Sequence, residues 1–436
     1  MTVQPNVDLD AALKEAEEKY AAANPKSRDY HESARNSLTG GVGRSSLYFR
    51  PFPLAFSHGE GAYIWDMDDH RYADFMGDYT AGIFGHNHSV TRRVLLETFD
   101  NGIALNGPHK HEAPFAEALC RRFPAFEQVR FANSGTEANI WALSLARAVS
   151  GKSHVMAFEG CYHGGVFNFE HGSTPVNYPI PWVLAPYNDL EGTLALIDKH
   201  EADLAAVIIE PMVGASGCIP AEKDFLQGLR DATQEKGIIL LFDEVMTSRL
   251  GPNGYQGEVG ITPDLTSVSK YLGGGLTFGA FGGRADLMQR FDQSGDNPLP
   301  QSGTFNNNVL TMAAGLAALE EIYTEDVARE LNATGDDLRT KLNALAEKYG
   351  VPVQFTGVGS MLNIHFTADP VRSPDDFHKT DVRKRDLFHF DMMDQDQFLA
   401  RSGMIALSLP MTGAEINVFV AAVDEFFASR RSLLAE

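Results

Sequence analysis

Short apolar runs separated by amphipathic segments constrain the fold of this chain more than any other feature. Such runs are typical of strands buried on both faces of a sheet. Segments between them, such as TEANIWALSLARAV, have the spacing of helices that cover the sheet. The alternation predicts an α/β fold with a large, mostly parallel sheet. The predicted strands are VRFA (129–132), HVMAF (154–158), LAAVIIE (204–210), GIILLFD (237–243), DLTSVS (264–269) and FGAFGGR (278–284).

The 436 residues are enough for one large and one smaller domain. We expect an N-terminal segment at 1–75, a large α/β domain at 76–320 and a small α+β domain at 321–436. The N-terminal segment contains DLDAALKEAEEKYAAANP, a predicted helix that Asp8 or Asp10 caps and Pro25 ends. It also contains GEGAYIWDMDDHRYADF, a predicted hairpin, and we expect it to pack with the small domain. The chain ends in a predicted helix, GAEINVFVAAVDEFFASRRSLL.

Charge and cysteine content argue against several classes of protein. Lys plus Arg is 36 and Asp plus Glu is 58, so the formal net charge is −22 and the surface repels nucleic acid and anionic membranes. No apolar run approaches the roughly 20 residues of a membrane span, and the first residues lack a signal-peptide core. Three cysteines are too few for a disulfide framework. We expect a cytoplasmic protein with neither nucleic acid nor membrane as a partner.

Polar residues follow the predicted strands, where open α/β sheets bind ligands. VRFA leads into NSGTE (133–137) and a helix, which forms either an anion site or an ordinary helix cap. GIILLFD ends in Asp243, a carboxylate that must be paired because bare burial costs too much. HVMAF leads into a glycine-rich loop with Tyr162 and His163, and we expect His163 to shape that loop.

Lys270, in TSVSKYLGGG, stands between the last parallel strand and three glycines. It is either a solvated loop lysine or a buried amine that acts as a nucleophile. Asp243 and Lys270 are 270 − 243 = 27 residues apart, about one strand–crossover–strand repeat, so neighbouring strands would bring them together. An anion cradle, an aromatic platform, a buried carboxylate and a lysine are together what pyridoxal 5′-phosphate requires.

Five motifs resemble, in order and spacing, those of class III aminotransferases. They are FANSGTEAN, GCYHGG, FDEVMTSR, SVSKYLGGGL and SGTFNNN, and the resemblance runs from about residue 35 to the C-terminus. It implies the fold type I of PLP-dependent transferases, with a seven-stranded type of sheet and a smaller α+β domain. Within the class the chain is most similar to β-amino-acid (β-phenylalanine) transaminases and to glutamate-1-semialdehyde aminomutases.

The resemblance also implies roles for individual residues. Lys270 would form the Schiff base with the cofactor and move protons, and Asp243 would pair with the pyridinium nitrogen. Thr304 would reach the phosphate of the other subunit, which implies a homodimer with shared active sites. The residues that would contact the ring or the phosphate are Ser134, Gly135, Thr136, Tyr162, Val245 and Thr304.

Two arginines point to the substrate. Arg44 stands where β-amino-acid transaminases carry a carboxylate-binding arginine, and Arg401 lies one residue from the position of a second. Such a pair suits a pocket for the carboxylate of a β-amino acid and for the α-carboxylate of a 2-oxo acid. Each arginine is alternatively part of a surface or interdomain ion pair, and Tyr79 is either a pocket wall or a core residue. The donor, its enantiomer and the choice of pyruvate or 2-oxoglutarate as acceptor stay open.

Motifs of other enzyme classes are incomplete in this sequence. Ser267 and Lys270 fit the S-x-x-K pattern of serine acyl-transfer enzymes, but no K-T-G follows, and the glycines at 273–275 and 279 do not form a dinucleotide fingerprint. The pairs His86/His88 and His109/His111 have metal-ligand spacing without an obvious carboxylate or Cys partner, so we expect no metal site. The aminomutases carry G-T-x-x-x-N-P where GTFNNN lacks the proline. An aminomutase and an amine:pyruvate (ω-) transaminase remain as alternatives.

Overall fold

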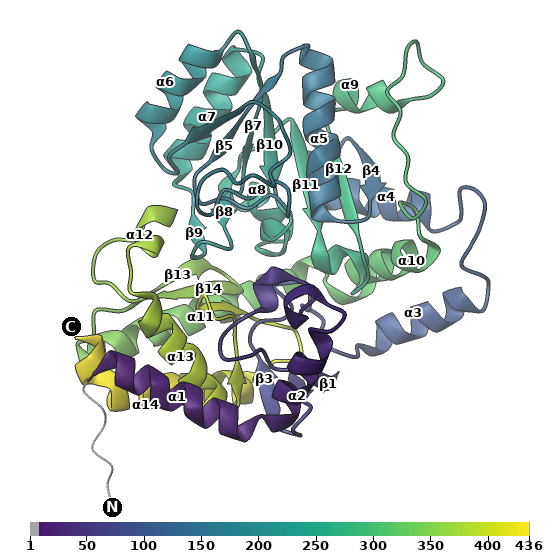
Figure 1. The fold of residues 1–436 in the computed structure, drawn as a ribbon. Coiled ribbons are helices and arrows are strands. Elements are labelled where there is room, and N and C mark those ends of the chain that lie inside the picture. Colours follow the sequence, from purple (N-terminus) through teal and green to yellow (C-terminus); the bar gives the residue numbers. More distant parts are fainter. Residues whose placement is uncertain (1–7, 436) are drawn as a thin grey trace, which may run out of the picture.

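The computed structural model describes residues 8–435 and contains a large seven-stranded sheet with helices on both faces (Figure 1). The strand order is β4-β12-β11-β10-β7-β5-β6. Strands β11, β10, β7, β5 and β6 run parallel, whereas β12 is antiparallel to both β11 and β4. The predicted α/β fold with a mostly parallel sheet is confirmed. Its strands are β4 (Gln128–Ala132), β5 (His154–Phe158), β6 (Trp182–Ala185), β7 (Leu204–Ile209), β10 (Ile239–Asp243), β11 (Leu265–Ser269) and β12 (Gly279–Gly283).

The central strands are apolar on both faces because helices cover both faces. In β7, Ala206 and Ile208 pack in the cluster that includes helix α5 (Gly135–Ser150). Val207 and Ile209 pack in the opposite cluster, with helix α7 (Lys223–Glu235). Successive strand residues point to opposite faces, so a strand between two helical layers must be apolar at every position.

The N-terminal segment forms a sheet with the C-terminal part of the chain. Strands β1 (Phe56–Glu60), β2 (Tyr63–Asp66) and β3 (Arg71–Asp74) are joined by β15 (Gln397–Phe398), which runs parallel to β3. The hairpin expected from the sequence is β2 and β3. The domain boundaries after residues 75 and 320 stay predictions.

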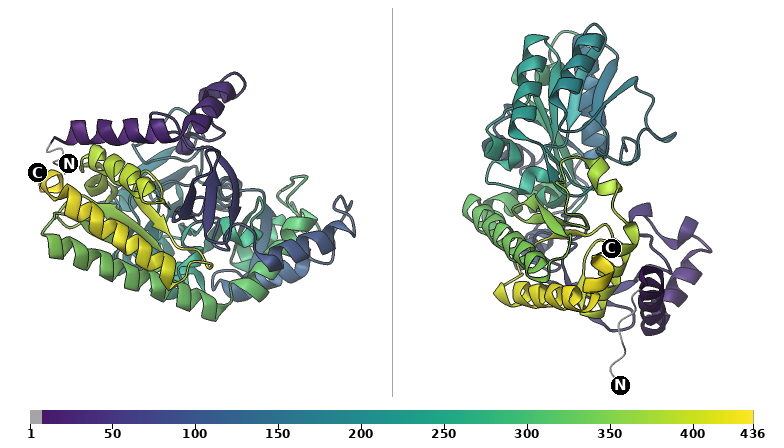
Figure 2. Two further views of the ribbon diagram at one scale, coloured as in Figure 1. Left: turned by 90° about the horizontal axis from the view of Figure 1, so that it is seen from below. Right: turned by 90° about the vertical axis from the view of Figure 1, so that its left-hand side faces the viewer.

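The first helix also lies against the C-terminal part. Helix α1 (Leu9–Ala23) packs beside α13 (Val382–Asp394), as the different views of Figure 2 show. Asp8 caps α1, accepting from the N–H groups of Asp10 and Ala11. Helix α1 ends before Pro25, as the sequence predicts, and Pro25 begins a second helix, α2 (Pro25–Ala34), because proline suits the first turn of a helix.

The remaining elements connect these layers or build the C-terminal part around the antiparallel sheet β13-β14-β16. No helix within residues 8–435 is both long and apolar enough to span a membrane. The remaining helices are α3 (Ser89–Phe99), α4 (Glu112–Arg122), α6 (Leu190–His200), α8 (Gly254–Val259), α9 (Ala285–Met288), α10 (Val309–Ala317), α11 (Glu325–Tyr349), α12 (Pro374–His378) and α14 (Gly413–Leu434). The remaining strands are β8 (Met212–Val213), β9 (Ile219–Pro220), β13 (Gln354–Val358), β14 (Met361–His365) and β16 (Met404–Ala406).

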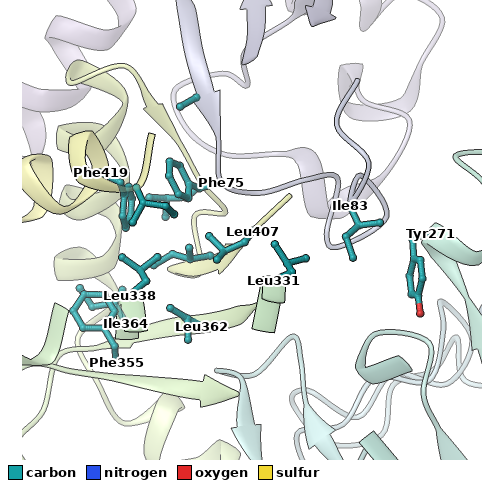
Figure 3. Close-up of a cluster of buried hydrophobic side chains, with 14 of the residues drawn as sticks. Phe75, Ile83, Tyr271, Leu331, Leu338, Phe355, Leu362, Ile364, Leu407 and Phe419 are labelled. Atoms are coloured by element: carbon teal, nitrogen blue, oxygen red, sulfur yellow. The ribbon is translucent and has the colours of Figure 1, made fainter. Parts of the chain in front are cut away.

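One hydrophobic cluster joins the N-terminal segment, the C-terminal helices and the edge of the large sheet (Figure 3). Phe75 follows β3 and stacks on Phe419 of α14, with ring centroids 4.3 Å apart. Tyr271, directly after Lys270, belongs to the same cluster, and its hydroxyl donates to the Ser248 carbonyl. The backbone next to Lys270 is therefore fixed by the core.

Truncating Phe419 should destabilise the protein strongly. Phe419→Ala opens a cavity beside Phe75 and should cost about 3–5 kcal/mol of unfolding free energy. Val418 is the matched control, since it neighbours Phe419 on α14 but is 55% exposed. Urea or thermal unfolding should show a large loss for Phe419→Ala and almost none for Val418→Ala. Equal losses would contradict this packing.

Candidate active site

Strands β10 and β11 bring Asp243 and Lys270 to the same edge of the sheet. The two strands are parallel neighbours, and Asp243 lies opposite Ser267. Lys270 comes three residues after Ser267, directly beyond the end of β11. The carboxyl ends of parallel strands therefore place both residues at the edge where such sheets bind ligands.

The backbone and the amine of Lys270 are both unusual. Its φ of 59° is left-handed, a conformation that non-glycine residues adopt rarely and that is frequent at functional sites. Burial lowers the pKa of the amine to about 8, although the carboxylates of Asp78 and Asp243 act to raise it. The structure thus favours a buried amine over a solvated loop lysine.

Asp243 is 3% exposed, and its carboxylate is held from several sides. Its Oδ2 atom accepts from Asn139 Nδ2 and from His163 Nδ1, both at 2.8 Å. Its Oδ1 atom accepts from the Val245 N–H at 3.0 Å and, more weakly, from the Ser267 hydroxyl at 3.4 Å. The long Ser267 contact leaves Oδ1 with capacity for a further donor.

The sequence analysis missed two residues that support the site, Asn139 and Glu210. Asn139 lies on the buried face of α5, where a polar residue among alanines and leucines needs a partner. Glu210 directly follows β7, as Asp243 ends β10, and it accepts from the N–H groups of Tyr162 at 2.7 Å and Gly214 at 3.0 Å. Burial raises the pKa of Glu210 to about 7. The same signal that singled out Asp243, a carboxylate after an apolar run, was present for Glu210.

The N-terminus of α5 opens beside Asp243. Ser134 caps the helix by accepting from the Glu137 N–H at 3.1 Å. This leaves the N–H groups of Gly135 and Thr136 without a partner among the described residues, as expected for the first turn of a helix. A Cβ at Gly135 would lie 2.7 Å from the Val245 side chain, so glycine permits this approach. Ser134, Gly135, Thr136 and Val245 therefore lie together at the start of α5, and their contacts with a cofactor stay a prediction.

The other two residues predicted to contact the cofactor, Tyr162 and Thr304, are both exposed. Tyr162 is 40% exposed and lies in the loop that Glu210 anchors. Thr304 is exposed and does not line the cavity that holds Lys270. Asn306, two residues after Thr304, accepts from Asn133 Nδ2 at 2.9 Å, so the Thr304 loop lies beside the start of α5.

The predicted substrate residues line two adjoining cavities. Arg44, Tyr79 and Arg401 line one of about 560 Å³. Arg44 also lines a second, of about 880 Å³, that holds Lys270. A further cavity of about 780 Å³ lies between α3 and α10 and contains none of the predicted site residues. Arg44 therefore stands where the lysine cavity and the second arginine's cavity meet.

Each arginine already has an acidic partner. Arg44 Nη2 lies 2.6 Å from Asp78 Oδ1, with both side chains more than half exposed. Arg401 makes two contacts with Asp386, Nε to Oδ1 at 2.6 Å and Nη2 to Oδ2 at 2.5 Å. In this structure Arg401 therefore forms an ion pair, the alternative to a carboxylate-binding role that the sequence left open.

The geometry also bears on the alternative chemistries. Ser267 lies on strand β11, so Ser267 and Lys270 do not share a helix face as the S-x-x-K reading requires. His86 Nε2 pairs with Asp74 at 3.1 Å, and His109 Nε2 lies 2.8 Å from the Asn307 carbonyl. Within residues 8–435 no group of three His, Cys, Asp or Glu side chains is arranged to hold a metal ion.

Comparisons with known proteins agree with this geometry. Residues 48–384 match the profile of the family described as aminotransferase class-III, and the chain belongs to the class III aminotransferases. It is 46% identical over 426 residues to the β-phenylalanine transaminase of Variovorax paradoxus, with 98% of each chain covered. The crystal structure of a β-phenylalanine aminotransferase from that organism superposes with a TM-score of 0.96 over 98% of this chain and 99% of that one.

Two further solved structures are informative. An ω-transaminase from Sphaerobacter thermophilus is 36% identical, with a TM-score of 0.88 over 93% of this chain and 98% of that one. A glutamate-1-semialdehyde aminomutase from Pseudomonas aeruginosa PAO1 is 22% identical, with a TM-score of 0.89 over 97% and 98%, and so shares the fold alone. The chain is therefore an aminotransferase of fold type I.

Pyridoxal 5′-phosphate, the cofactor of this family, fits the residues that are present. Asp243 Oδ1 can accept from a ring N–H, and the first turn of α5 offers free N–H groups to an anion. Lys270 offers a buried amine whose lowered pKa favours the neutral, nucleophilic form. The cofactor predicted from the sequence is thus confirmed.

The lowered pKa of Lys270 can be measured in the apoprotein. An amine-reactive reagent attacks only neutral lysine, so labelling of Lys270 should rise through a midpoint near pH 8. This is about two pH units below an ordinary lysine. Pulse labelling with peptide mass spectrometry reports the midpoint, and adding the cofactor should protect Lys270. A midpoint near that of surface lysines would contradict the burial of this amine.

Proposed function

We propose that this enzyme transfers the amino group of an aromatic β-amino acid, such as β-phenylalanine, to a 2-oxo acid by a ping-pong mechanism. The observation that carries the proposal is the place of Arg44, on the wall shared by the cavity of Lys270 and the cavity of Arg401. A carboxylate held at Arg44 leaves the amine-bearing carbon of a β-amino acid directed towards Lys270. The likeness to a β-phenylalanine transaminase over nearly the whole chain supports this substrate class.

The described residues divide the work of such a reaction. When bound, the cofactor supplies the aldehyde that takes up the amino group and the ring that withdraws electrons from the adjacent C–H bond. Asp243, whose position is fixed by Asn139 and His163, would hold the ring nitrogen protonated. The first turn of α5 would hold the phosphate. Lys270 would carry the proton from the carbon that bears the amine to the cofactor, and in the second half-reaction it would carry a proton from the cofactor to the acceptor carbon.

Arg44 and Arg401 serve the two carboxylates. A guanidinium binds a carboxylate through two parallel N–H contacts, which fixes orientation as well as position. Arg44 would receive the carboxylate of the β-amino acid. Arg401 would leave Asp386 to receive the α-carboxylate of the 2-oxo acid, and Tyr79 lines the same cavity.

A panel of amino donors tests the proposal. β-Phenylalanine, 1-phenylethylamine, 4-aminobutyrate and glutamate-1-semialdehyde would each be assayed with pyruvate and with 2-oxoglutarate. β-Phenylalanine should give the highest kcat/KM. A preference for 1-phenylethylamine would instead indicate an amine transaminase, and isomerisation of glutamate-1-semialdehyde without an acceptor would indicate an aminomutase.

Removing the Arg44 guanidinium should affect only donors that carry a carboxylate. Arg44→Ala strands that carboxylate and should cost about 2–4 kcal/mol in kcat/KM with β-phenylalanine. With 1-phenylethylamine, which has no carboxylate, the loss should be small. Arg372→Ala is the matched control, since Arg372 is exposed and lines neither cavity. Equal losses on both amines would show that Arg44 is structural.

We also infer that the active enzyme is a homodimer. Thr304 is exposed, and its neighbour Phe305 is 66% exposed. Other large apolar side chains are exposed along α3 and the loop that follows it: Leu96, Phe99, Ile103 and Leu105. Exposed apolar side chains of this size gathered in one region are typical of an interface. A second copy seated there would bring its Thr304 towards the phosphate site.

Disrupting this face should separate the subunits. Phe305→Asp places a charge at the proposed interface and should shift the protein from dimer to monomer, with loss of activity and of retained cofactor. Val382→Asp is the control, since Val382 is similarly exposed at the start of α13. Light scattering under assay conditions reports the mass. A fully active monomer of the unmodified enzyme would contradict a shared active site.

A further inference from the structure

A left-handed turn lies beside Arg44. Gly77, Asp78, Tyr79 and Thr80 have φ values of 52°, 46°, 53° and 78°. Glycine adopts this conformation freely and Asp tolerates it, but tyrosine and threonine adopt it rarely. Consecutive residues of this kind persist only where the surroundings hold them, and they concentrate at binding and catalytic sites.

Contacts outside the Arg44 ion pair hold this turn. The Gly82 N–H donates to the Gly77 carbonyl at 2.8 Å and closes the turn. The buried Asp74 carboxylate accepts from the Gly77 N–H at 2.9 Å and fixes the entry. The Tyr79 hydroxyl donates to the Ser46 carbonyl at 2.8 Å. The position of the Asp78 backbone is therefore set by the turn and not by its ion pair.

Asp78 presents its carboxylate to Arg44 end-on. Its Oδ1 atom lies 2.6 Å from Arg44 Nη2. This is the one hydrogen bond between these two side chains in the described part of the chain. Both residues line the cavity that holds Lys270. A single-nitrogen contact leaves the rest of the guanidinium fork open, so an incoming carboxylate can bind it through two nitrogens.

We propose that Asp78 is a resident stand-in for the substrate carboxylate and sets how tightly Arg44 binds carboxylate ligands. This inference rests on the proposed carboxylate-binding role of Arg44. In the free enzyme Asp78 neutralises Arg44 and keeps its side chain at the mouth of the site. A ligand carboxylate must draw Arg44 away from Asp78, because the turn prevents Asp78 from following.

The competition selects among ligands. A carboxylate that engages Arg44 through two nitrogens replaces one contact with two and binds despite Asp78. A neutral ligand carries no carboxylate that could bind Arg44, so the ion pair between Arg44 and Asp78 stays in place. Asp78 therefore lowers the affinity for every carboxylate ligand and leaves uncharged ligands of the same shape unaffected.

Replacing Asp78 by asparagine separates its charge from its backbone role. Asparagine has the same shape and also tolerates the left-handed conformation, so Asp78→Asn keeps the turn and removes the competing anion. The probes are 3-phenylpropionate, which is β-phenylalanine without its amine, and the uncharged 3-phenylpropanamide. The dissociation constant of each would be measured calorimetrically with the holoenzyme. The ratio of the carboxylate constant to the amide constant should fall by about two- to fivefold, the range of an exposed ion pair.

The matched control is Asp69→Asn. Asp69 is also left-handed, with a φ of 71°, and also forms an exposed ion pair, with Lys26 at 3.2 Å. It lines neither of the two cavities, so its replacement should leave the ratio unchanged. In kinetics, Asp78→Asn should lower the KM for β-phenylalanine relative to that for 1-phenylethylamine.

Three outcomes would overturn the inference. They are an unchanged ratio in Asp78→Asn, weaker carboxylate binding in that variant, and failure of 3-phenylpropionate to bind either protein. The binding measurement does not need turnover. A fall in the ratio without turnover of β-phenylalanine would therefore support the role of Asp78 and reject the proposed function.

Discussion

The active site depends on one buried anion, the carboxylate of Asp243. Burying a carboxylate is costly unless its lone pairs are satisfied, and here the donors come from three separate parts of the chain. Asn139 lies on α5, His163 lies in the loop after β5, and the Val245 N–H follows β10 itself. Satisfying Asp243 therefore aligns the helix that would hold the phosphate with the loop that carries Tyr162.

Charges of opposite sign are arranged outward from this carboxylate. Lys270 lies directly after the next strand, β11, and its pKa is lowered by burial while Asp78 and Asp243 oppose that effect. Arg44 and Asp78 form the outer pair and line the same cavity as Lys270. Asp243 is buried and Lys270 is partly buried, which suits cofactor chemistry, whereas the exposed Arg44–Asp78 pair suits exchange with ligands.

Most of the large sheet was predictable, because helices on both faces require strands that are apolar at every position. Strand β6 was missed, since Trp182–Ala185 is a four-residue edge strand after a proline-rich loop and gives little periodic signal. Asn139 was missed because a polar residue inside an amphipathic helix does not reveal its partner. Asp243 of β10 is that partner, and it lies 104 residues away in the chain.

The sequence by itself determined the fold class and which groups are predicted to meet the cofactor. The carboxyl ends of parallel strands lie at one edge of the sheet. Because Asp243 and Lys270 follow two neighbouring parallel strands, the sequence alone predicted that they lie at the same edge. Only the tertiary structure decided the state of the arginines. Arg44 pairs with Asp78, 34 residues away, and Arg401 with Asp386, 15 residues away, without any periodic pattern that links them. Such contacts depend on how loops and helices pack, which local sequence does not encode.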